Sequence, residues 1–411
     1  MPENIFHIEP EMDIPTFLAK EIGAKLAYVD ESVRSVTVAP GKDGITLVLG
    51  QEPDEAMAAV LVKKVNHVVR SMADGAFEPN LRGVIEDKMD RPIRYDKDPM
   101  AYLVPNREVV IEGSGYYALG PLLSGLIDFF EERYQAVAAD MGARPYRFPA
   151  LISPTYLEKV KYFENFPHSL SFVTHLREDL DVIEQFSKTA CCQDGAVNTD
   201  SDSFAQAQAM LSPTVCHHLY MMLADSTLPE EGLVATAFGN CFRYESSNME
   251  SLERLWNFSM REIIFVGSGD FVQQGLDRAR DHMNAILDDM ELAYRIETAN
   301  DPFFIGNYRN QAAYQSAFEM KFEVRMALPY KDDTLAAGSY NRHKDFFGRS
   351  LDIRLAGGGA AETGCVGFGV ERLAFAFVAQ HGPDVANWPT PVRQHMETTR
   401  AKWHTSKMPD F

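Results

Sequence analysis

The stretch Cys365-Val-Gly-Phe-Gly-Val-Glu-Arg-Leu-Ala-Phe-Ala-Phe377 places two glycines and one arginine inside an apolar run. Glycine allows the backbone to approach a ligand closely, and the guanidinium group of Arg372 offers a fixed cationic fork for phosphate. Alone, the same pattern fits a strand-to-helix turn whose arginine is structural. The interpretation of this stretch therefore depends on the rest of the chain.

The composition indicates a soluble globular protein with room for a large core. The chain has 411 residues, of which 45% are hydrophobic, and this length favours one large domain plus a smaller one. The acidic start carries no signal-like pattern, and no apolar run reaches the roughly 18 residues that cross a bilayer. Five irregularly spaced cysteines indicate no disulfide framework and favour the reducing cytoplasm. We therefore expect a cytoplasmic protein without a membrane segment.

The first part of the chain, residues 1–105, is predicted to form a small α/β domain followed by a linker. Helical patterns over 14–26 and 54–72 flank two β-like runs at 35–38 and 45–49. The segment 77–106 is rich in Asp, Arg and Pro and is interpreted as the linker.

Residues 106–411 are predicted to form the second domain. Strand patterns such as 234–238, 262–266 and 321–326 follow one another with few crossover helices, and a long helix is expected over 271–294. This order favours a mostly antiparallel sheet flanked by helices, so the fold class is α+β.

A second informative segment begins with Asn240-Cys-Phe-Arg-Tyr-Glu and returns, after a long loop, as Arg254-Leu-Trp-Asn-Phe-Ser-Met-Arg-Glu. Arg243 and Glu245 are two residues apart, so a strand would place them on one face. Such a pair can be a structural ion pair. The order of a Phe-Arg-x-Glu strand, a long loop, an aromatic return strand and a later Gly-x-Gly-x-Glu-Arg helix favours a ligand site instead.

This ordered set resembles class II aminoacyl-tRNA synthetases across roughly residues 110 to 380. The resemblance implies a homodimer with an antiparallel catalytic sheet flanked by helices, which activates an amino acid with ATP and Mg²⁺. It also implies that the catalytic residues are Arg243 at the α-phosphate and Arg372 at the γ-phosphate. The remaining ATP contacts that it implies are Glu245 near the adenine and the amino group, Arg254, and Phe258 stacked on the adenine.

Within this class the seryl branch is the most similar. The segments 321–329 and Ser339-Tyr-Asn-Arg-His-Lys-Asp resemble strands of seryl-tRNA synthetases, which implies that Ser339 and Asn341 join Glu245 in binding the amino acid. One departure is Leu335-Ala-Ala-Gly, which replaces an acidic residue of the family. This departure leaves one magnesium or ATP contact unassigned.

Two thiols and one carboxylate, from Cys216, Glu262 and Cys365, are identified as a candidate zinc site with an open coordination position. The set resembles that of methanogen-type seryl-tRNA synthetases and of their relatives, the amino acid:carrier-protein ligases, in which zinc holds the substrate's amino group. His217 and His218 are rival ligands, but consecutive residues point in different directions, which favours roles outside the ligand set. The other three cysteines, Cys191, Cys192 and Cys241, are expected to be buried as small apolar residues.

The acceptor of the activated amino acid is predicted to be a carrier protein. Residues 1–105 contain no heptad run long enough for a tRNA-binding coiled coil, and their acidic residues outnumber their basic ones, which disfavours tRNA. The segment Tyr162-Phe-Glu-Asn-Phe-Pro-His also resembles the carrier-protein ligases. The leading hypothesis is an AMP-forming ligase that loads a small amino acid, through its adenylate, onto a carrier's phosphopantetheine thiol. The alternatives are a seryl-type tRNA synthetase and a catalytically silent paralogue that acts as a binding or regulatory subunit.

Overall fold

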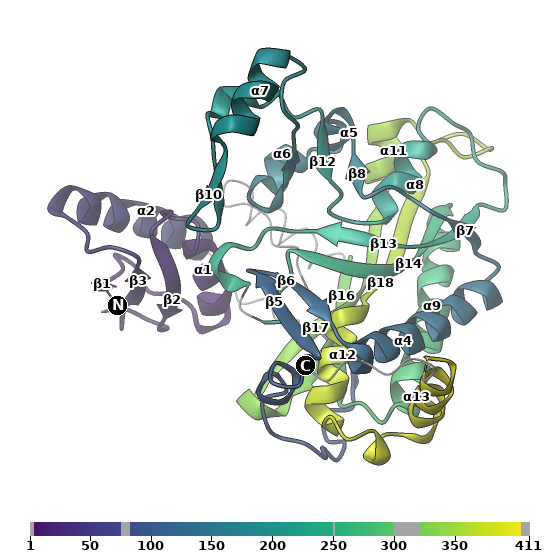
Figure 1. Ribbon diagram of the computed structural model, residues 1–411. Coiled ribbons are helices and arrows are strands. Elements are labelled where there is room, and N and C mark those ends of the chain that lie inside the picture. Colours follow the sequence, from purple (N-terminus) through teal and green to yellow (C-terminus); the bar gives the residue numbers. More distant parts are fainter. Residues whose placement is uncertain (1–3, 75–82, 250, 300–319, 404–411) are drawn as a thin grey trace.

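The computed structural model describes residues 4–74, 83–249, 251–299 and 320–403 (Figure 1). Its N-terminal unit is a three-stranded antiparallel sheet in the order β1-β3-β2, covered by two helices. The elements of this unit are β1 (Asn4–Ile8), η1 (Thr16–Leu18), α1 (Ala19–Leu26), β2 (Val33–Val38), β3 (Ile45–Leu49) and α2 (Glu55–Ala73). The predicted helices and strands are therefore present, and β1 is an addition to them.

The N-terminal unit has its own core because both its strands and its helices are amphipathic. Alternate residues of β3, Ile45, Leu47 and Leu49, are buried against apolar residues of α2 such as Leu61. The helix α2 begins after Asp54, whose carboxylate accepts the Met57 N–H at 2.8 Å. All the buried members of this core come from the N-terminal unit.

The segment interpreted as a linker contributes a strand to the large sheet. Within it, β4 (Val84–Asp87) pairs antiparallel with β15 (Tyr294–Thr298), and α3 (Met100–Leu103) follows. The alternation in Val84-Ile-Glu-Asp is too short to give a clear strand signal, and pairing at the sheet edge stabilises it. The sequence prediction of a plain linker was wrong at this point.

The large sheet has eight strands in the order β4-β15-β16-β17-β18-β14-β13-β7. All neighbouring pairs are antiparallel except β13 with β7. Its other strands are β7 (Arg144–Tyr146), β13 (Leu233–Phe242), β14 (Asn257–Gly267), β16 (Lys321–Leu328), β17 (Asp333–Lys344) and β18 (Glu362–Gly369). The predicted α+β fold with a mostly antiparallel sheet is confirmed.

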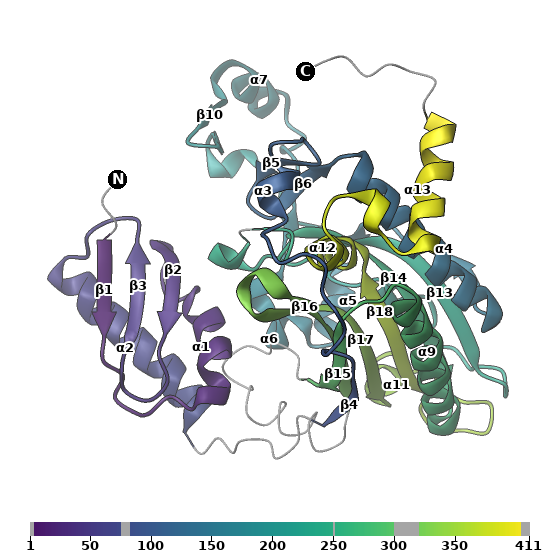
Figure 2. The same ribbon diagram turned by 90° about the horizontal axis from the view of Figure 1, so that it is seen from below.

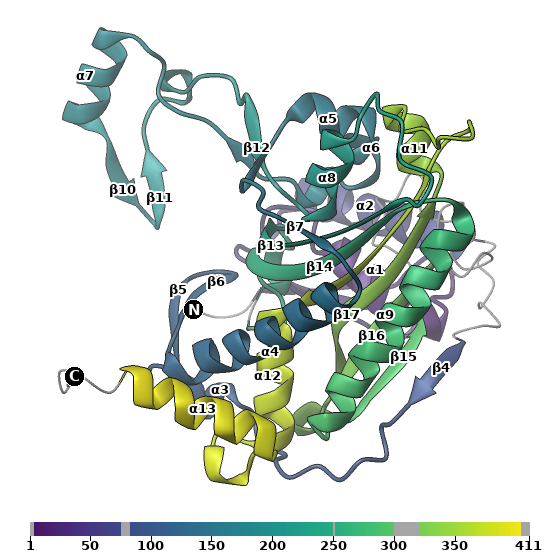
Figure 3. The ribbon, with the colours of Figure 1, turned by 90° about the vertical axis from the view of Figure 1, so that its right-hand side faces the viewer.

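One face of this sheet is covered by long helices, as Figure 3 shows. They are α4 (Pro121–Asp140), α9 (Gly269–Asp289) and α12 (Val370–His381), with α13 (Thr390–Trp403) packed on α4. The helix α9 ends five residues earlier than the expected boundary, because the chain reverses at Glu291, where φ is 53°. Tyr294, predicted as helical, begins β15 instead.

The opposite face carries shorter elements and a projecting arm. The arm consists of α7 (Leu180–Thr189) and the hairpin of β10 (Cys191–Gln193) with β11 (Ala196–Asn198) (Figure 3). The prediction that Cys191 and Cys192 are buried was wrong, because both lie exposed on this hairpin, whereas Cys241 is buried as expected. No helix in the described ranges has the length and apolar character to cross a membrane.

The remaining elements connect these layers. They are β5 (Val109–Gly113), β6 (Tyr116–Leu119), β8 (Leu151–Ile152), α5 (Pro154–Lys159), α6 (Tyr162–Asn165), η2 (Pro167–Ser169), β9 (Phe172–Val173), η3 (Ser201–Ser203), β12 (Ala209–Leu211), α8 (Cys216–Met222), η4 (Ser246–Asn248), η5 (Pro329–Lys331), α11 (Phe346–Leu351) and η6 (Val385–Asn387).

Candidate metal centre and nucleotide site

The central strands place several of the candidate residues on one face of the large sheet. Gly367 of β18 lies between Ser339 of β17 and Glu262 of β14, and in the next row Cys365 is opposite Asn341. Residues that pair across strands, or lie two apart along one strand, share a face. A Cβ at Gly367 would lie 2.7 Å from the Met260 methyl group, so a larger residue here would have to displace the end of that side chain.

Cys216, Glu262 and Cys365 form a compact buried cluster. Cys216 comes from the first turn of α8, and the other two residues come from neighbouring strands. Their ligand atoms all lie within 4.8 Å of one another, and the two sulfur atoms are 3.9 Å apart. Zn–S bonds of about 2.3 Å at a tetrahedral angle separate two sulfurs by about 3.8 Å. The donor set and its spacing therefore fit a zinc ion.

Hydrogen bonds hold the Glu262 carboxylate in place. The Thr214 hydroxyl and the Val215 N–H donate to Oε1 at 2.9 and 3.2 Å, and the Cys216 N–H donates to Oε2 at 3.1 Å. On the other side, the Asn341 amide donates to Cys365 Sγ at 3.6 Å. Sequence reasoning missed Thr214, because only the folded chain brings this hydroxyl to Glu262.

The cluster is acidic and has no cation of its own among its three members. Burial, followed by the nearby Cys365, raises the pKa of Glu262 to about 8. Burial also raises the pKa of the Cys216 thiol well above its usual range. The hydrogen bond with Cys216 instead lowers the pKa of Cys365 well below its usual range. A divalent cation would compensate the negative charge of this buried cluster in place of protons.

The two histidines beside Cys216 do not join the cluster. The ring of His217 packs edge-on against Tyr156, Tyr162 and Phe347, with centroids 5.7, 5.7 and 5.2 Å away, and burial lowers its pKa to about 3. The Nε2 atom of His218 lies 3.0 Å from the Ser212 hydroxyl. Their placement agrees with roles outside the ligand set.

Arg243 and Glu245 lie just beyond the end of β13, which stops at Phe242, and not within the strand as the sequence predicted. Arg243 Nε donates to the Pro213 carbonyl at 3.0 Å, and its guanidinium carbon is 5.4 Å from the centre of the Phe258 ring. Although the strand has ended, the Arg243 guanidinium still acts on Glu245 and helps to lower the pKa of that carboxylate.

Glu245 is surrounded by cationic groups. It forms an ion pair with Arg254, and Arg372 Nη2 lies 4.0 Å from its other oxygen. Burial acts to raise the pKa of Glu245, but Arg254, Arg372 and Arg243 outweigh it and hold the pKa below its usual range. Three guanidinium groups around one carboxylate leave a positive surplus, which suits a polyphosphate ligand.

The position that departs from the seryl pattern lies beside Arg372. The backbone carbonyl of Ala336 accepts a hydrogen bond from Arg372 Nη1 at 3.2 Å. A carboxylate is nevertheless near, because Glu323 of the adjacent strand β16 pairs across from Ser339 and acts on Arg372. The sequence predicted this strand within 321–329 but no role for Glu323.

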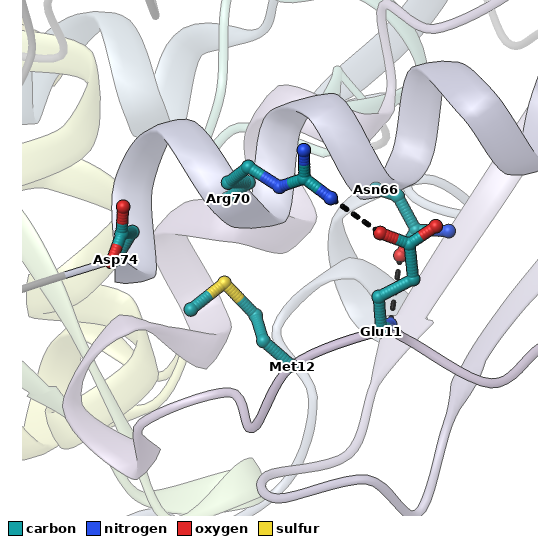
Figure 4. Close-up of a pocket in the computed structure, with 5 residues that line it drawn as sticks. All are labelled: Glu11, Met12, Asn66, Arg70 and Asp74. Carbon is teal, nitrogen blue, oxygen red and sulfur yellow. Dashed lines mark hydrogen bonds and ion pairs between the residues drawn. The ribbon is translucent and has the colours of Figure 1, made fainter.

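A separate cavity of about 290 Å³ lies in the N-terminal unit (Figure 4). It is lined by Glu11, Met12, Asn66, Arg70 and Asp74. Arg70 pairs with the Glu11 carboxylate, and the Asn66 side chain accepts the Glu11 N–H at 2.9 Å. These polar groups satisfy one another, and none of the candidate residues lines the cavity.

The chain is similar in sequence to several known proteins. No family model matches the chain. Two proteins of Bradyrhizobium diazoefficiens, amino acid–acyl-carrier-protein ligases 1 and 2, are 33% and 36% identical to it over 300 and 248 residues. These alignments cover 72% and 60% of this chain and 89% and 72% of the two ligases. A type-2 serine–tRNA ligase of Methanothermobacter thermautotrophicus is 24% identical over 291 residues, which are 69% of this chain and 57% of that protein.

The fold is also that of a solved synthetase. In a complex of Methanopyrus kandleri seryl-tRNA synthetase with Aquifex aeolicus tRNASec, the synthetase superposes with a TM-score of 0.72 at 18% identity, covering 99% of this chain and 79% of that one. The resemblance to class II synthetases drawn from the sequence is thus confirmed. With 33% identity over 300 aligned residues that cover 89% of one relative, this chain belongs to the family of amino acid–acyl-carrier-protein ligases.

Proposed function

We propose that this protein activates a small amino acid with ATP and transfers it to the phosphopantetheine thiol of a carrier protein. The observation that carries the proposal is the presence of both an acidic metal cluster and an arginine-rich cluster in a chain that belongs to the carrier-protein ligases. The first cluster suits a metal-held amino group. The second suits the phosphates of ATP.

The metal cluster would orient the amino acid. Cys216, Glu262 and Cys365 would hold the ion, and zinc with an open position supplies Lewis acidity toward an amino group. Asn341, through its contacts with Cys365 Sγ at 3.6 Å and with the Ser339 hydroxyl at 2.9 Å, presents polar groups beside this position. A metal would bind the amino group, which all amino acids share. Selection among the side chains of amino acid substrates therefore depends on the surrounding pocket.

The arginine cluster would drive adenylation. Attack of the amino acid carboxylate on the α-phosphorus places negative charge on phosphate oxygens while pyrophosphate leaves. Arg243 and Arg372, fixed by the carbonyls of Pro213 and Ala336, are preorganised to stabilise that charge, with Mg²⁺ bound to ATP. Phe258, which lies below the Arg243 guanidinium, offers a flat surface for the adenine.

The second step needs no nucleophile from the protein. The carrier's thiol would attack the carbonyl carbon of the aminoacyl-adenylate, forming a thioester and releasing AMP. We further infer a cytoplasmic homodimer, supported by five cysteines without a disulfide and by the resemblance to class II synthetases.

Charging of tRNA is the second candidate. It is favoured by the similarity to type-2 serine–tRNA ligases and by the superposition on a synthetase bound to tRNA. The net charge of −20 opposes it, because RNA binding depends on exposed lysine and arginine.

The decisive experiment separates activation from transfer. Exchange of labelled pyrophosphate into ATP is measured with each amino acid in turn, and we expect strong exchange with one or a few small amino acids. The active amino acid is then offered to a holo-carrier protein, to the same carrier without phosphopantetheine, and to tRNA. Label on the holo-carrier alone supports the proposal. Label on tRNA alone assigns a synthetase, and ATP binding without exchange assigns a catalytically silent paralogue.

A further inference from the structure

The N-terminal unit is docked against the loop that follows β13. Figures 1 and 2 show α1 as the helix of this unit that faces the large sheet. Just after α1, the Tyr28 hydroxyl donates to the Tyr244 carbonyl at 3.1 Å, and the Ala27 carbonyl accepts from the Ser246 hydroxyl at 3.3 Å. These two contacts lie on either side of Glu245, the carboxylate at the centre of the arginine cluster.

Lys25 of α1 is buried at this junction, with 6% of its surface exposed. Its Nζ lies 3.3 Å from Nε2 of His168, a residue of η2 in the catalytic part of the chain. Burial lowers the pKa of Lys25 to about 8, while Glu21 and Glu245 act to raise it. A buried ammonium group needs nearby negative charge, and here that charge comes from both units.

The loop has a backbone conformation that needs support. Ser246 has a φ of 54°, in the left-handed region that residues other than glycine rarely adopt. Its hydroxyl is the group that donates to Ala27. The N-terminal unit therefore holds the residue next to Glu245 in an otherwise unfavourable conformation.

Further contacts fix the docking of the two units. The Phe166 ring packs against the apolar core of the N-terminal unit, and the His168 ring lies edge-on to Tyr28 with centroids 5.2 Å apart. At the other end of the interface, Lys20 pairs with Asp333 at 2.9 Å. Apolar packing and hydrogen bonds together hold α1 in one position on the loop.

We propose that the N-terminal unit is a working part of the ATP site, and that Lys25 is the residue through which it positions Glu245. This inference rests on the proposed function, in which Glu245 contacts ATP. Lys25 and Glu245 attract each other across this junction, while Arg254 and Arg372 lie within 4.0 Å of the carboxylate oxygens. Without Lys25, the junction beside Glu245 would lose its buried charge, and the carboxylate would be held less firmly at the position where ATP binds.

The test compares Lys25→Met with Lys25→Arg and with Lys63→Met, which removes an exposed charge from α2 of the same unit. Binding of a non-hydrolysable ATP analogue is measured by calorimetry, and KM and kcat are measured by pyrophosphate exchange. We expect Lys25→Met to weaken nucleotide binding and raise the KM for ATP by about tenfold with a smaller change in kcat. Lys25→Arg should restore most of the affinity, and Lys63→Met should resemble the wild type.

Unchanged nucleotide affinity in a folded Lys25→Met variant would overturn the inference. If that variant unfolds, Ser246→Ala provides the test, because it removes only the hydroxyl that donates to Ala27 and is expected to weaken nucleotide binding by a smaller factor. A Ser246→Ala protein with wild-type affinity would then contradict the inference. Wild-type protein that binds the analogue but exchanges no pyrophosphate would refute the proposed function, while the binding titration would still decide the role of Lys25.

Discussion

The candidate site has an acidic end and a cationic end, and each lacks the counter-charge that its ligand would bring. At one end, Cys216, Glu262 and Cys365 bring three acidic groups together in a buried space. At the other end, three guanidinium groups surround Glu245. The first arrangement is stable as a metal site and the second as a phosphate site, because in each case the ligand supplies the missing charge. The difference indicates a site for two substrates of unlike charge.

The largest effect is expected from the acidic end. The change Cys365→Ala removes one of the three metal donors, so we expect bound zinc to fall to a small fraction of one per chain and pyrophosphate exchange to be abolished. Zinc content by mass spectrometry measures the first effect independently of activity. Cys241→Ala is the matched control, because Cys241 is also buried but lies outside the cluster. Full zinc occupancy in Cys365→Ala would show that this residue is not a ligand.

A smaller but still large effect is expected from the cationic end. The change Arg243→Ala should lower kcat/KM for exchange by about 10²- to 10³-fold, because it removes preorganised positive charge from the transition state. Its zinc content should not change, which distinguishes the two ends. Arg349→Ala, at an exposed arginine paired with Asp345, serves as the control. Exchange at the wild-type rate would assign Arg243 a structural role.

The smallest effect of the three is expected at the support of the metal cluster. The change Thr214→Val keeps the shape of the side chain but removes the hydroxyl that donates to Glu262, so we expect zinc affinity to fall about 10-fold. Competition with a chelator of known affinity measures this loss, and activity should return when zinc is in excess. Thr189→Val on the exposed arm is the control. An unchanged zinc affinity would mean that the two backbone N–H groups alone hold the carboxylate.

Much of the fold and of the candidate site was predictable from the sequence, for different reasons. The alternation in 45–49 and the spacing along 54–72 reflect local amphipathic patterns, which survive in the structure as β3 and α2. The convergence of Cys216, Glu262 and Cys365 was implied by the family resemblance. Strand register then accounts for it, because Glu262 and Cys365 lie on neighbouring strands, and Cys365 is two residues from Gly367, the partner of Glu262.

Other features could not be predicted because they depend on contacts distant in sequence. The strand β4 forms only because β15 offers a partner, and Cys191 and Cys192 are exposed because their hairpin projects from the body. The burial of Lys25 requires the docking of two units, and no local sequence pattern predicts that docking. Local patterns thus predict elements well, whereas docking depends on the complete three-dimensional arrangement.

The dipeptide Pro213–Thr214 contacts both the cationic end and the acidic end of the candidate site. The carbonyl of Pro213 accepts from Arg243, and the hydroxyl of the next residue donates to Glu262. A shift of this dipeptide therefore alters both ends at once. Because thermodynamic coupling is reciprocal, we expect zinc to change the affinity for ATP by the same factor by which ATP changes the affinity for zinc.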